Sequence, residues 1–103
     1  MDVQITFKLL EDKSIKLVNG QSVSVAGLAE YHVCPEREGF GRRVLGMLGS
    51  LTAKPIVGFA EDENVEFYRK CGWHVIDTRD EMYGKYIISN VALPVKFSVE
   101  GPW

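Results

Sequence analysis

The sequence predicts a single α/β domain of the α+β type, with one mixed, mostly antiparallel sheet and two helices. Apolar and polar residues alternate through the first third of the chain, as they do in half-buried strands. The apolar spacing then becomes helical, and short apolar runs typical of buried strands follow. The expected order is β-β-β-α-β-α-β-β, and the C-terminal tail allows one further edge strand.

Two short strands and a hairpin are expected at the start of the chain. Alternation over residues 5–9 predicts the first strand, 11–13 reads as a turn, and alternation over 15–17 predicts the second strand. Asn19-Gly20 follows, and it is the strongest two-residue hairpin signal because both residue types tolerate a positive φ. The second strand is therefore expected to turn back at these two residues.

The third strand is expected over 23–33, which is long for one strand. Gly27 lies inside it and predicts a bulge or a bend, because a glycine interrupts the packing of a strand. Pro35 ends the strand, since proline cannot donate to a ladder of hydrogen bonds.

A helix is predicted over 41–53, and Pro55 ends it because the residue before a proline is disfavoured in helical geometry. Gly46 and Gly49 inside this helix each cost about 1 kcal/mol relative to alanine, which predicts that the helix approaches the sheet closely. One apolar stripe supports the helix, formed by Phe40, Val44, Leu45, Leu48 and Leu51.

The second half of the chain alternates strands with a second helix. Residues 56–60 are a short apolar run that suits a buried strand. Acidic residues at 61–63 favour a helix start, and the helix continues to Cys71, where Gly72 is expected to stop it in the left-handed conformation. Two further strands are expected over 73–78 and 83–89.

The tail carries alternating apolar residues over 91–99, and Pro94 restricts it to the edge of a sheet. An apolar edge strand pairs readily with another chain. We therefore expect either a homodimer formed through residues 91–99, or pairing of the tail within its own sheet.

Composition excludes several classes of protein. Hydrophobic residues make up 46% and charged residues 25%, which is ordinary for a globular domain and excludes disorder, collagen and coiled coil. The net charge of −2 argues against nucleic acid or membrane as the partner. No secretory signal or long apolar span is visible, so a cytoplasmic protein is expected. Cys34 and Cys71 lie far apart with no C-x-x-C pair, which predicts buried thiols and no metal.

A glycine-rich segment at the start of the first helix is the first candidate site. Gly39 and Gly41 allow the backbone to approach a ligand, and a helix start directs unpaired N–H groups at it. Arg42 and Arg43 add positive charge there. An anion such as a pyrophosphate is the favoured ligand; the alternative is a loop that opens a helix and carries two solvated arginines.

The segment 63–73, ENVEFYRKCGW, adds a second motif after that loop, separated from it by a helix and a short strand. In this order the two motifs resemble the GNAT superfamily, whose members transfer an acetyl group from acetyl-coenzyme A (acetyl-CoA) to an amine. The resemblance covers about residues 28 to 89. It implies a short version of the fold that lacks the usual N-terminal strand and two helices. The sequence departs from the family at Glu36, where Arg or Gln is usual, and at Trp73, where Phe is usual.

The resemblance implies a role for each matching residue. Tyr68 would be the general acid that returns a proton to the departing thiolate. Strand alternation offers Glu30 or His32 as the general base, since both point to one side. The alternative is a non-catalytic module that binds acyl-CoA or a protein partner. The residues implied in coenzyme binding are Tyr31, Val33, Arg37, Glu38, Gly39, Phe40, Gly41, Arg42, Arg43 and Asn64.

Overall fold

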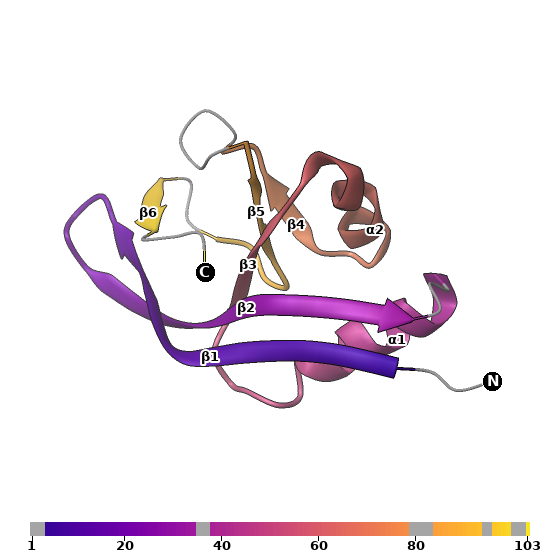
Figure 1. The fold of residues 1–103 in the computed structure, drawn as a ribbon. Coiled ribbons are helices and arrows are strands. Elements are labelled where there is room, and N and C mark those ends of the chain that lie inside the picture. The colour runs from indigo at the N-terminus through magenta and orange to yellow at the C-terminus, as the bar shows by residue number, and fades with distance from the viewer. Residues whose placement is uncertain (1–3, 35–37, 79–83, 94–95, 100–102) are drawn as a thin grey trace.

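The computed structural model describes residues 4–34, 38–78, 84–93, 96–99 and 103. Six strands form one sheet in the order β4-β5-β3-β2-β1-β6 (Figure 1). All neighbouring strands are antiparallel except β2 and β3, which are parallel. The elements along the chain are β1 (Gln4–Leu17), β2 (Ser22–Cys34), α1 (Glu38–Leu48), β3 (Ile56–Ala60), a 3-10 turn η1 (Asp62–Asn64), α2 (Val65–Lys70), β4 (His74–Ile76), β5 (Tyr86–Ser89) and β6 (Phe97–Val99).

The hairpin between β1 and β2 forms where Asn19-Gly20 predicts it. Gly20 adopts a φ of +87°, which a residue with a side chain rarely reaches, and its N–H donates to the Leu17 carbonyl at 3.0 Å. The Gln21 carbonyl accepts from the Leu17 N–H at 2.8 Å. The tight turn therefore sets the register of two strands that together form the longest part of the molecule.

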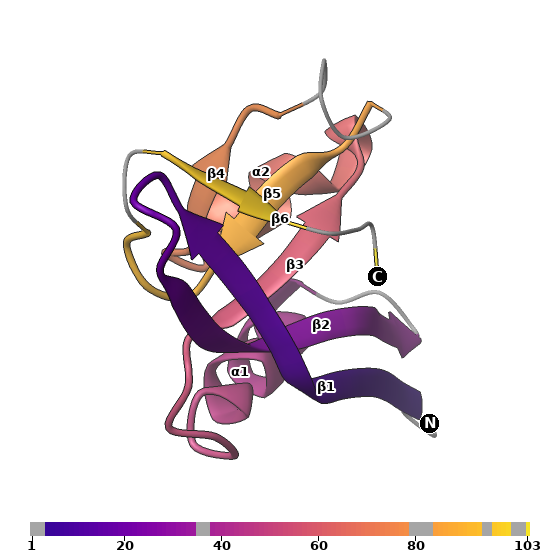
Figure 2. The ribbon, with the colours of Figure 1, turned by 90° about the vertical axis from the view of Figure 1, so that its left-hand side faces the viewer.

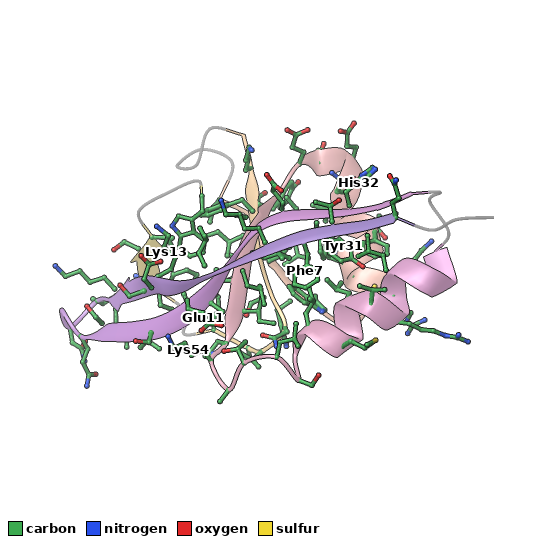
Figure 3. All side chains as sticks on the ribbon, turned by 60° about the horizontal axis from the view of Figure 1, so that its bottom comes forward. Phe7, Glu11, Lys13, Tyr31, His32 and Lys54 are labelled. Atoms are coloured by element: carbon green, nitrogen blue, oxygen red, sulfur yellow. The ribbon has the colours of Figure 1, made fainter. Side chains whose placement is uncertain are left out.

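The turn expected at 11–13 is wrong, because β1 runs through it as one strand. The pairing with β2 is irregular there: Leu10 pairs with Gly27 and Lys13 with Val25. Glu11 and Asp12 lie opposite the single residue Ala26, and this bulge puts Glu11 and Lys13 on opposite faces of the strand (Figure 3). The Lys54 Nζ atom, from a distant part of the chain, donates to the Glu11 carbonyl oxygen at 2.6 Å. The observed order of elements is therefore β-β-α-β-α-β-β-β.

The first helix ends earlier than predicted, at Leu48 and not at Ala53. The Ser50 Oγ atom donates to the Met47 carbonyl at 2.7 Å and closes a turn after the last helical residue. Leu51, expected in the apolar stripe, is exposed as a result. The expected close approach at the glycines is also wrong, since a Cβ at Gly46 would meet no atom within 4 Å and Gly49 lies beyond the helix.

The second helix, α2, ends as predicted, with Gly72 at a φ of +83°. The strands after it are shorter than the expected ranges 73–78 and 83–89. The tail pairs within its own sheet, where Ser98 lies opposite Lys16 of β1. Pro94 and Val95 lie outside the described residues, so the expectation about Pro94 concerns a part of the tail that is not described.

Two apolar cores lie on opposite faces of the sheet. The larger core joins the sheet to both helices and includes Leu28, Leu45, Val65, Tyr68 and Trp73. The smaller core lies on the other face, under the C-terminal tail, and includes Ile15, Val25, Val57 and Ile87, with Trp103 packed against them. Figure 2 shows β6 beside the hairpin end of β1, the strand with which it pairs. Burial on both faces holds the central strands in place.

Candidate active site

The parallel strands β2 and β3 pair over only three positions and then separate. Ala26, Gly27 and Leu28 lie opposite Ile56, Val57 and Gly58, and no pairing follows. Both strands continue beyond this point, β2 to Cys34 and β3 to Ala60. Figure 1 shows them diverging from the centre of the sheet, with α2 on the side of β3. The edge of β2 that faces β3 is therefore unpaired beyond Leu28.

A bulge at Ala29 accompanies the separation. Leu28 lies opposite Leu9 and Glu30 lies opposite Lys8, so Ala29 is an extra residue with no partner on β1. The extra residue lets Leu28 and Tyr31 both pack against the larger core, although they are three positions apart. The register is regular from Glu30 to Cys34, so Glu30 and His32 share the opposite face, as expected.

A cavity of about 280 Å³ lies where the two strands separate. Its polar side chains come from β2, the turn after β3, α2 and the segment before β5, so four distant parts of the chain meet there. The lining residues are Leu28, Ala29, Glu30, Tyr31, Phe59, Ala60, Glu61, Asn64, Tyr68 and Lys85.

The side chain of Tyr68 is packed into this cavity from α2. It is 8% exposed, and its ring contacts those of Phe67 and Trp73. Its hydroxyl makes no hydrogen bond to a described residue, and no fully buried side-chain oxygen among those residues lacks a partner. The hydroxyl oxygen is therefore open to the cavity. Burial, followed by the neighbouring Tyr31 and Cys71, raises the pKa of Tyr68 to about 12.

Tyr31 fastens the start of α1 to β2. Its hydroxyl donates to the Gly41 carbonyl, and its ring stacks on Phe67 at a centroid distance of 6.2 Å. Burial and the neighbouring Cys71 raise the pKa of Tyr31, while a backbone hydrogen bond from Leu45 acts in the opposite direction. In Figure 3, Tyr31 and Phe7 lie on the helix side of the strands and His32 lies on the other side.

Gly41 is needed for the packing of α1 against α2. A Cβ atom built on it would lie 3.3 Å from Phe67, which is closer than most real contacts. A Cβ built on Gly39 would meet no atom within 4 Å, so the first turn of the helix is open above that residue. The two glycines of the predicted loop thus differ: one allows the helices to pack and the other leaves space.

The structure brings four of the predicted site residues together in the cavity: Glu30, Tyr31, Asn64 and Tyr68. It leaves out His32, which is exposed on β2, and Val33, which pairs with Ile5 of β1. Arg37 lies outside the described residues. The remaining predicted residues form the first half of α1 and do not line the cavity: Glu38, Gly39, Phe40, Gly41, Arg42 and Arg43.

Sequence reasoning missed Ala29, Glu61 and Lys85. Ala29 carries no signal, because nothing in an alanine predicts a bulge. Glu61 could have been found, since it directly follows the strand 56–60 and such positions often form sites. Lys85 reaches the cavity only because β5 pairs with β3, which a pattern of residues does not reveal.

In the part of the chain that the structure describes, no three acidic, histidine or cysteine side chains lie close enough together to hold a metal ion. Among the same residues, no helix is both long enough and apolar enough to cross a bilayer.

No family model, no curated protein and no solved structure matches this chain. The resemblance to acetyltransferases therefore depends on the two motifs alone, and the geometry of the cavity is the independent observation beside them.

Proposed function

We propose that this chain is an acetyl-CoA-dependent N-acetyltransferase that transfers an acetyl group to a primary amine by direct attack. One observation carries the proposal: an unpaired strand edge and an accessible, otherwise buried phenol meet in one cavity. The edge offers backbone groups to an extended ligand, and the phenol offers a proton to a leaving group. Both suit an acyl transfer from a thioester with a long flexible arm, because the arm needs hydrogen-bond partners and the departing thiolate needs a proton.

The unpaired edge of β2 suits the pantetheine arm of acetyl-CoA. This arm contains two amide groups, which can pair with a strand edge as an added strand would. The backbone of residues 31–33 supplies the donors and acceptors. The cavity of about 280 Å³ is large enough for the thioester end and a small amine, and the rest of the coenzyme would lie outside it.

The start of α1 suits the pyrophosphate. The helix has eleven residues, and its first N–H groups have no partner within the helix. The open space above Gly39 and the exposed Arg42 and Arg43 support an anion at this position. Because Gly41 is tied to Tyr31, the pyrophosphate site and the strand edge are held in one geometry.

Tyr68 acts as the general acid. The amine nitrogen attacks the thioester carbonyl carbon, the C–N bond forms and the C–S bond breaks. Tyr68 gives its proton to the departing sulfur and becomes a phenolate, and the proton that the amine nitrogen loses then restores the phenol, directly or through solvent. A pKa of about 12 keeps the phenol protonated and ready throughout the neutral range.

Glu30 is the better candidate for the general base. Glu30 is among the residues that line the cavity, at the point where β2 leaves β3, whereas His32 is not. Its side chain leaves the strand on the face opposite Tyr31, so a water molecule has to bridge its carboxylate and the amine. The amine arrives as an ammonium ion, and a carboxylate can accept its proton through a water molecule. Replacing Glu30 by Gln should therefore lower turnover more at low pH than at high pH, where the amine is already deprotonated.

Thermal unfolding with acetyl-CoA tests coenzyme binding. A ligand at about 100 times its Kd adds roughly 2.7 kcal/mol of stability. In a domain of this size each kcal/mol raises the Tm by roughly 4–8 °C. No shift at millimolar acetyl-CoA would contradict the proposal.

Tyr68→Phe tests the chemistry. Turnover should fall about 10²-fold while the acetyl-CoA shift remains. Tyr86→Phe is the matched control: it removes another buried tyrosine hydroxyl, one that donates to Asp62 and does not line the cavity. Equal turnover in the two variants would exclude Tyr68 as the acid.

A second candidate is a non-catalytic module that binds acyl-CoA or a protein partner. One observation favours the protein partner: β1 carries Ile5 and Phe7, which are 39% and 43% exposed, next to an edge that β6 covers only at residues 15–17. For an acyl-CoA module, acetyl-CoA would raise the Tm but no amine would be acetylated. For a protein-binding module, neither effect would be observed.

A further inference from the structure

The cavity between β2 and β3 reaches both faces of the sheet. Its lining includes Leu28, Ala60 and Tyr68, which belong to the larger core on the helix side. It also includes Phe59, which packs against the smaller core on the other side. Because consecutive residues of a strand point to opposite faces, a hollow lined by both Phe59 and Ala60 extends through the plane of the sheet. The cavity therefore has a helix-side end at Tyr68 and a tail-side end at Phe59.

Trp103 spans the point where the two strands separate, on the tail side. On β2 its ring lies against Gly27, where a Cβ atom would be only 2.7 Å from the Trp103 Cε3 atom. On β3 it meets the Phe59 ring edge to face, with 5.2 Å between the ring centroids and 77° between the ring planes. Gly27 is the second of the three paired positions of β2, and Phe59 is the first residue of β3 beyond them. One aromatic side chain therefore contacts both strands where the opening begins.

This arrangement fixes the position of the Phe59 ring. The ring has the cavity on one side and Trp103 on the other. Trp103 itself cannot move closer to β2, because it already touches the backbone at a position that only glycine can occupy. The space into which Phe59 could turn away from the cavity is thus filled, and the tail-side end of the cavity keeps a fixed width.

We propose that Trp103 is a positioning residue for the acceptor: it holds the Phe59 ring at the tail-side end of the cavity, which then admits an unbranched primary amine and excludes a branched one. The inference rests on the proposed function for the identity of the acceptor, but not for the shape of the cavity. Glu30 leaves β2 on the same side of the sheet, so the alkyl group of the amine meets the Phe59 ring while its ammonium group lies toward a carboxylate.

The test compares pentylamine with neopentylamine, two isomers of equal charge that differ only in branching. Thiol release from acetyl-CoA gives kcat and KM for each amine. The wild type should show a kcat/KM for pentylamine about tenfold above that for neopentylamine, the usual effect of excess bulk in an apolar pocket. Trp103→Leu should reduce this preference to about twofold, mainly by lowering the KM for neopentylamine. Trp103→Phe retains a ring and should keep most of the preference.

Two further variants show whether Trp103 acts through Phe59. Phe59→Leu should reduce the preference by itself, and Trp103→Leu added to it should reduce the preference no further. Phe97→Leu is the matched control, because it removes another partly buried aromatic side chain from the smaller core, one whose ring does not pair with that of Phe59. It should lower the Tm and leave the tenfold preference unchanged.

The fluorescence of Trp103 gives a readout that does not need turnover. The chain has two tryptophans, so Trp73→Phe leaves Trp103 as the only one. Pentylamine bound against Phe59 should change the emission of Trp103 in this variant, in the presence of coenzyme A or without it. Adding Phe59→Leu should reduce that change.

The outcomes separate this inference from the proposed function. A change in Trp103 emission without thiol release would support the positioning role and contradict acetyl transfer. Thiol release with equal use of the two isomers by the wild type would support the transferase and overturn the positioning role. Equal effects of Trp103→Leu and Phe97→Leu on the preference would also overturn it, as would an emission that neither amine changes at millimolar concentration.

Discussion

The buried phenol of Tyr68 makes stability depend on pH at the alkaline end. Its pKa rises from 10.0 to about 12 on folding, mainly through burial. Below pH 10 the phenol is protonated in both states and contributes no pH dependence. Between these two values the unfolded chain releases the proton and the folded chain retains it, so stability falls as pH rises, by roughly 3 kcal/mol in total.

Urea unfolding at several alkaline pH values measures this loss. Tyr68→Phe lacks the ionising group, so its stability should fall less steeply than that of the wild type above pH 10. The difference between the two curves isolates Tyr68 from the lysines and the other tyrosines. Parallel curves would show that Tyr68 ionises as readily in the folded chain as in the unfolded one.

Gly27 and Gly46 should respond in opposite ways to alanine. A Cβ at Gly27 would lie 2.7 Å from the Trp103 ring and 3.0 Å from the Lys13 side chain, so Gly27→Ala should lower stability by about 1–3 kcal/mol. Gly46 lies inside α1 with open space around it, so Gly46→Ala should raise stability by about 0.5–1 kcal/mol.

Denaturant unfolding of both variants checks this pair. Combining Trp103→Leu with Gly27→Ala should recover part of the loss, because the flexible leucine leaves room for the methyl group. A destabilising Gly46→Ala would revive the expectation that this glycine allows the helix to approach the sheet.

Individual residues also show which local signals were sufficient. The turns at Asn19-Gly20 and Gly72 were predicted correctly because glycine tolerates a positive φ, and Gly20 and Gly72 both adopt one. The end of α1 near Ser50 was missed because Pro55 gave the stronger signal. In the structure the Ser50 hydroxyl already donates to the Met47 carbonyl, before the chain reaches Pro55. Local chemistry therefore predicts the position of a turn better than the length of an element.

At the scale of elements, the separation of β2 from β3 should be visible in amide hydrogen exchange. Amides of residues 29–33 that point away from β1 have no strand partner on the other side. They should exchange faster than the amides of residues 26–28 that face β3. Acetyl-CoA should slow the exchange over 29–33 if the strand edge binds it, while β6 serves as an unaffected reference.

Uniform protection along the whole of β2 would mean that the strands stay paired in solution and that the cavity is closed. Fast exchange over residues 29–33 that acetyl-CoA leaves unchanged would instead show that the strand edge is open but does not bind this ligand.

The sequence predicted most elements, but it did not predict that β1 continues as one strand through residues 11–13, where a turn was expected. Glu11-Asp12-Lys13 are charged residues typical of a turn, and nothing nearby in the sequence opposes that interpretation. The stabilising contact comes from Lys54, which is 43 residues away. The candidate site also depends on contacts between residues far apart in the sequence. Lys85 and Glu30 meet Tyr68 only through strand pairing, whereas Tyr68 itself was identified from its motif.

At the scale of the molecule, the tail still allows a dimer. It pairs with β1 along one side over three positions, and β6 is the last strand of the sheet, so none of the described residues forms a strand on its other side. We expect a mass of about twice 11.6 kDa in sedimentation equilibrium at micromolar concentration if two copies pair through residues 91–99. A mass equal to one chain would contradict the dimer and leave the tail as a cover for the smaller core.

The two helices bury one face of the sheet and the tail buries the other. The molecule measures 50 × 28 × 20 Å, and its single sheet has two faces that both need cover. Each face has its own apolar cluster. Ile5 and Phe7 lie near the N-terminal end of β1, at the opposite end of the strand from the hairpin turn, and both are partly exposed.

The extra residue at Ala29 has a consequence for how this strand tolerates change. It resets the phase of β2, so that the alternation before it and the alternation after it are out of step. Deleting Ala29 would leave Leu28 and Tyr31 two positions apart, so a regular strand would keep both on the helix side and the Tyr31 phenol would still face Phe67. The deletion would remove the bulge that accompanies the opening between β2 and β3 without turning over any side chain of the strand.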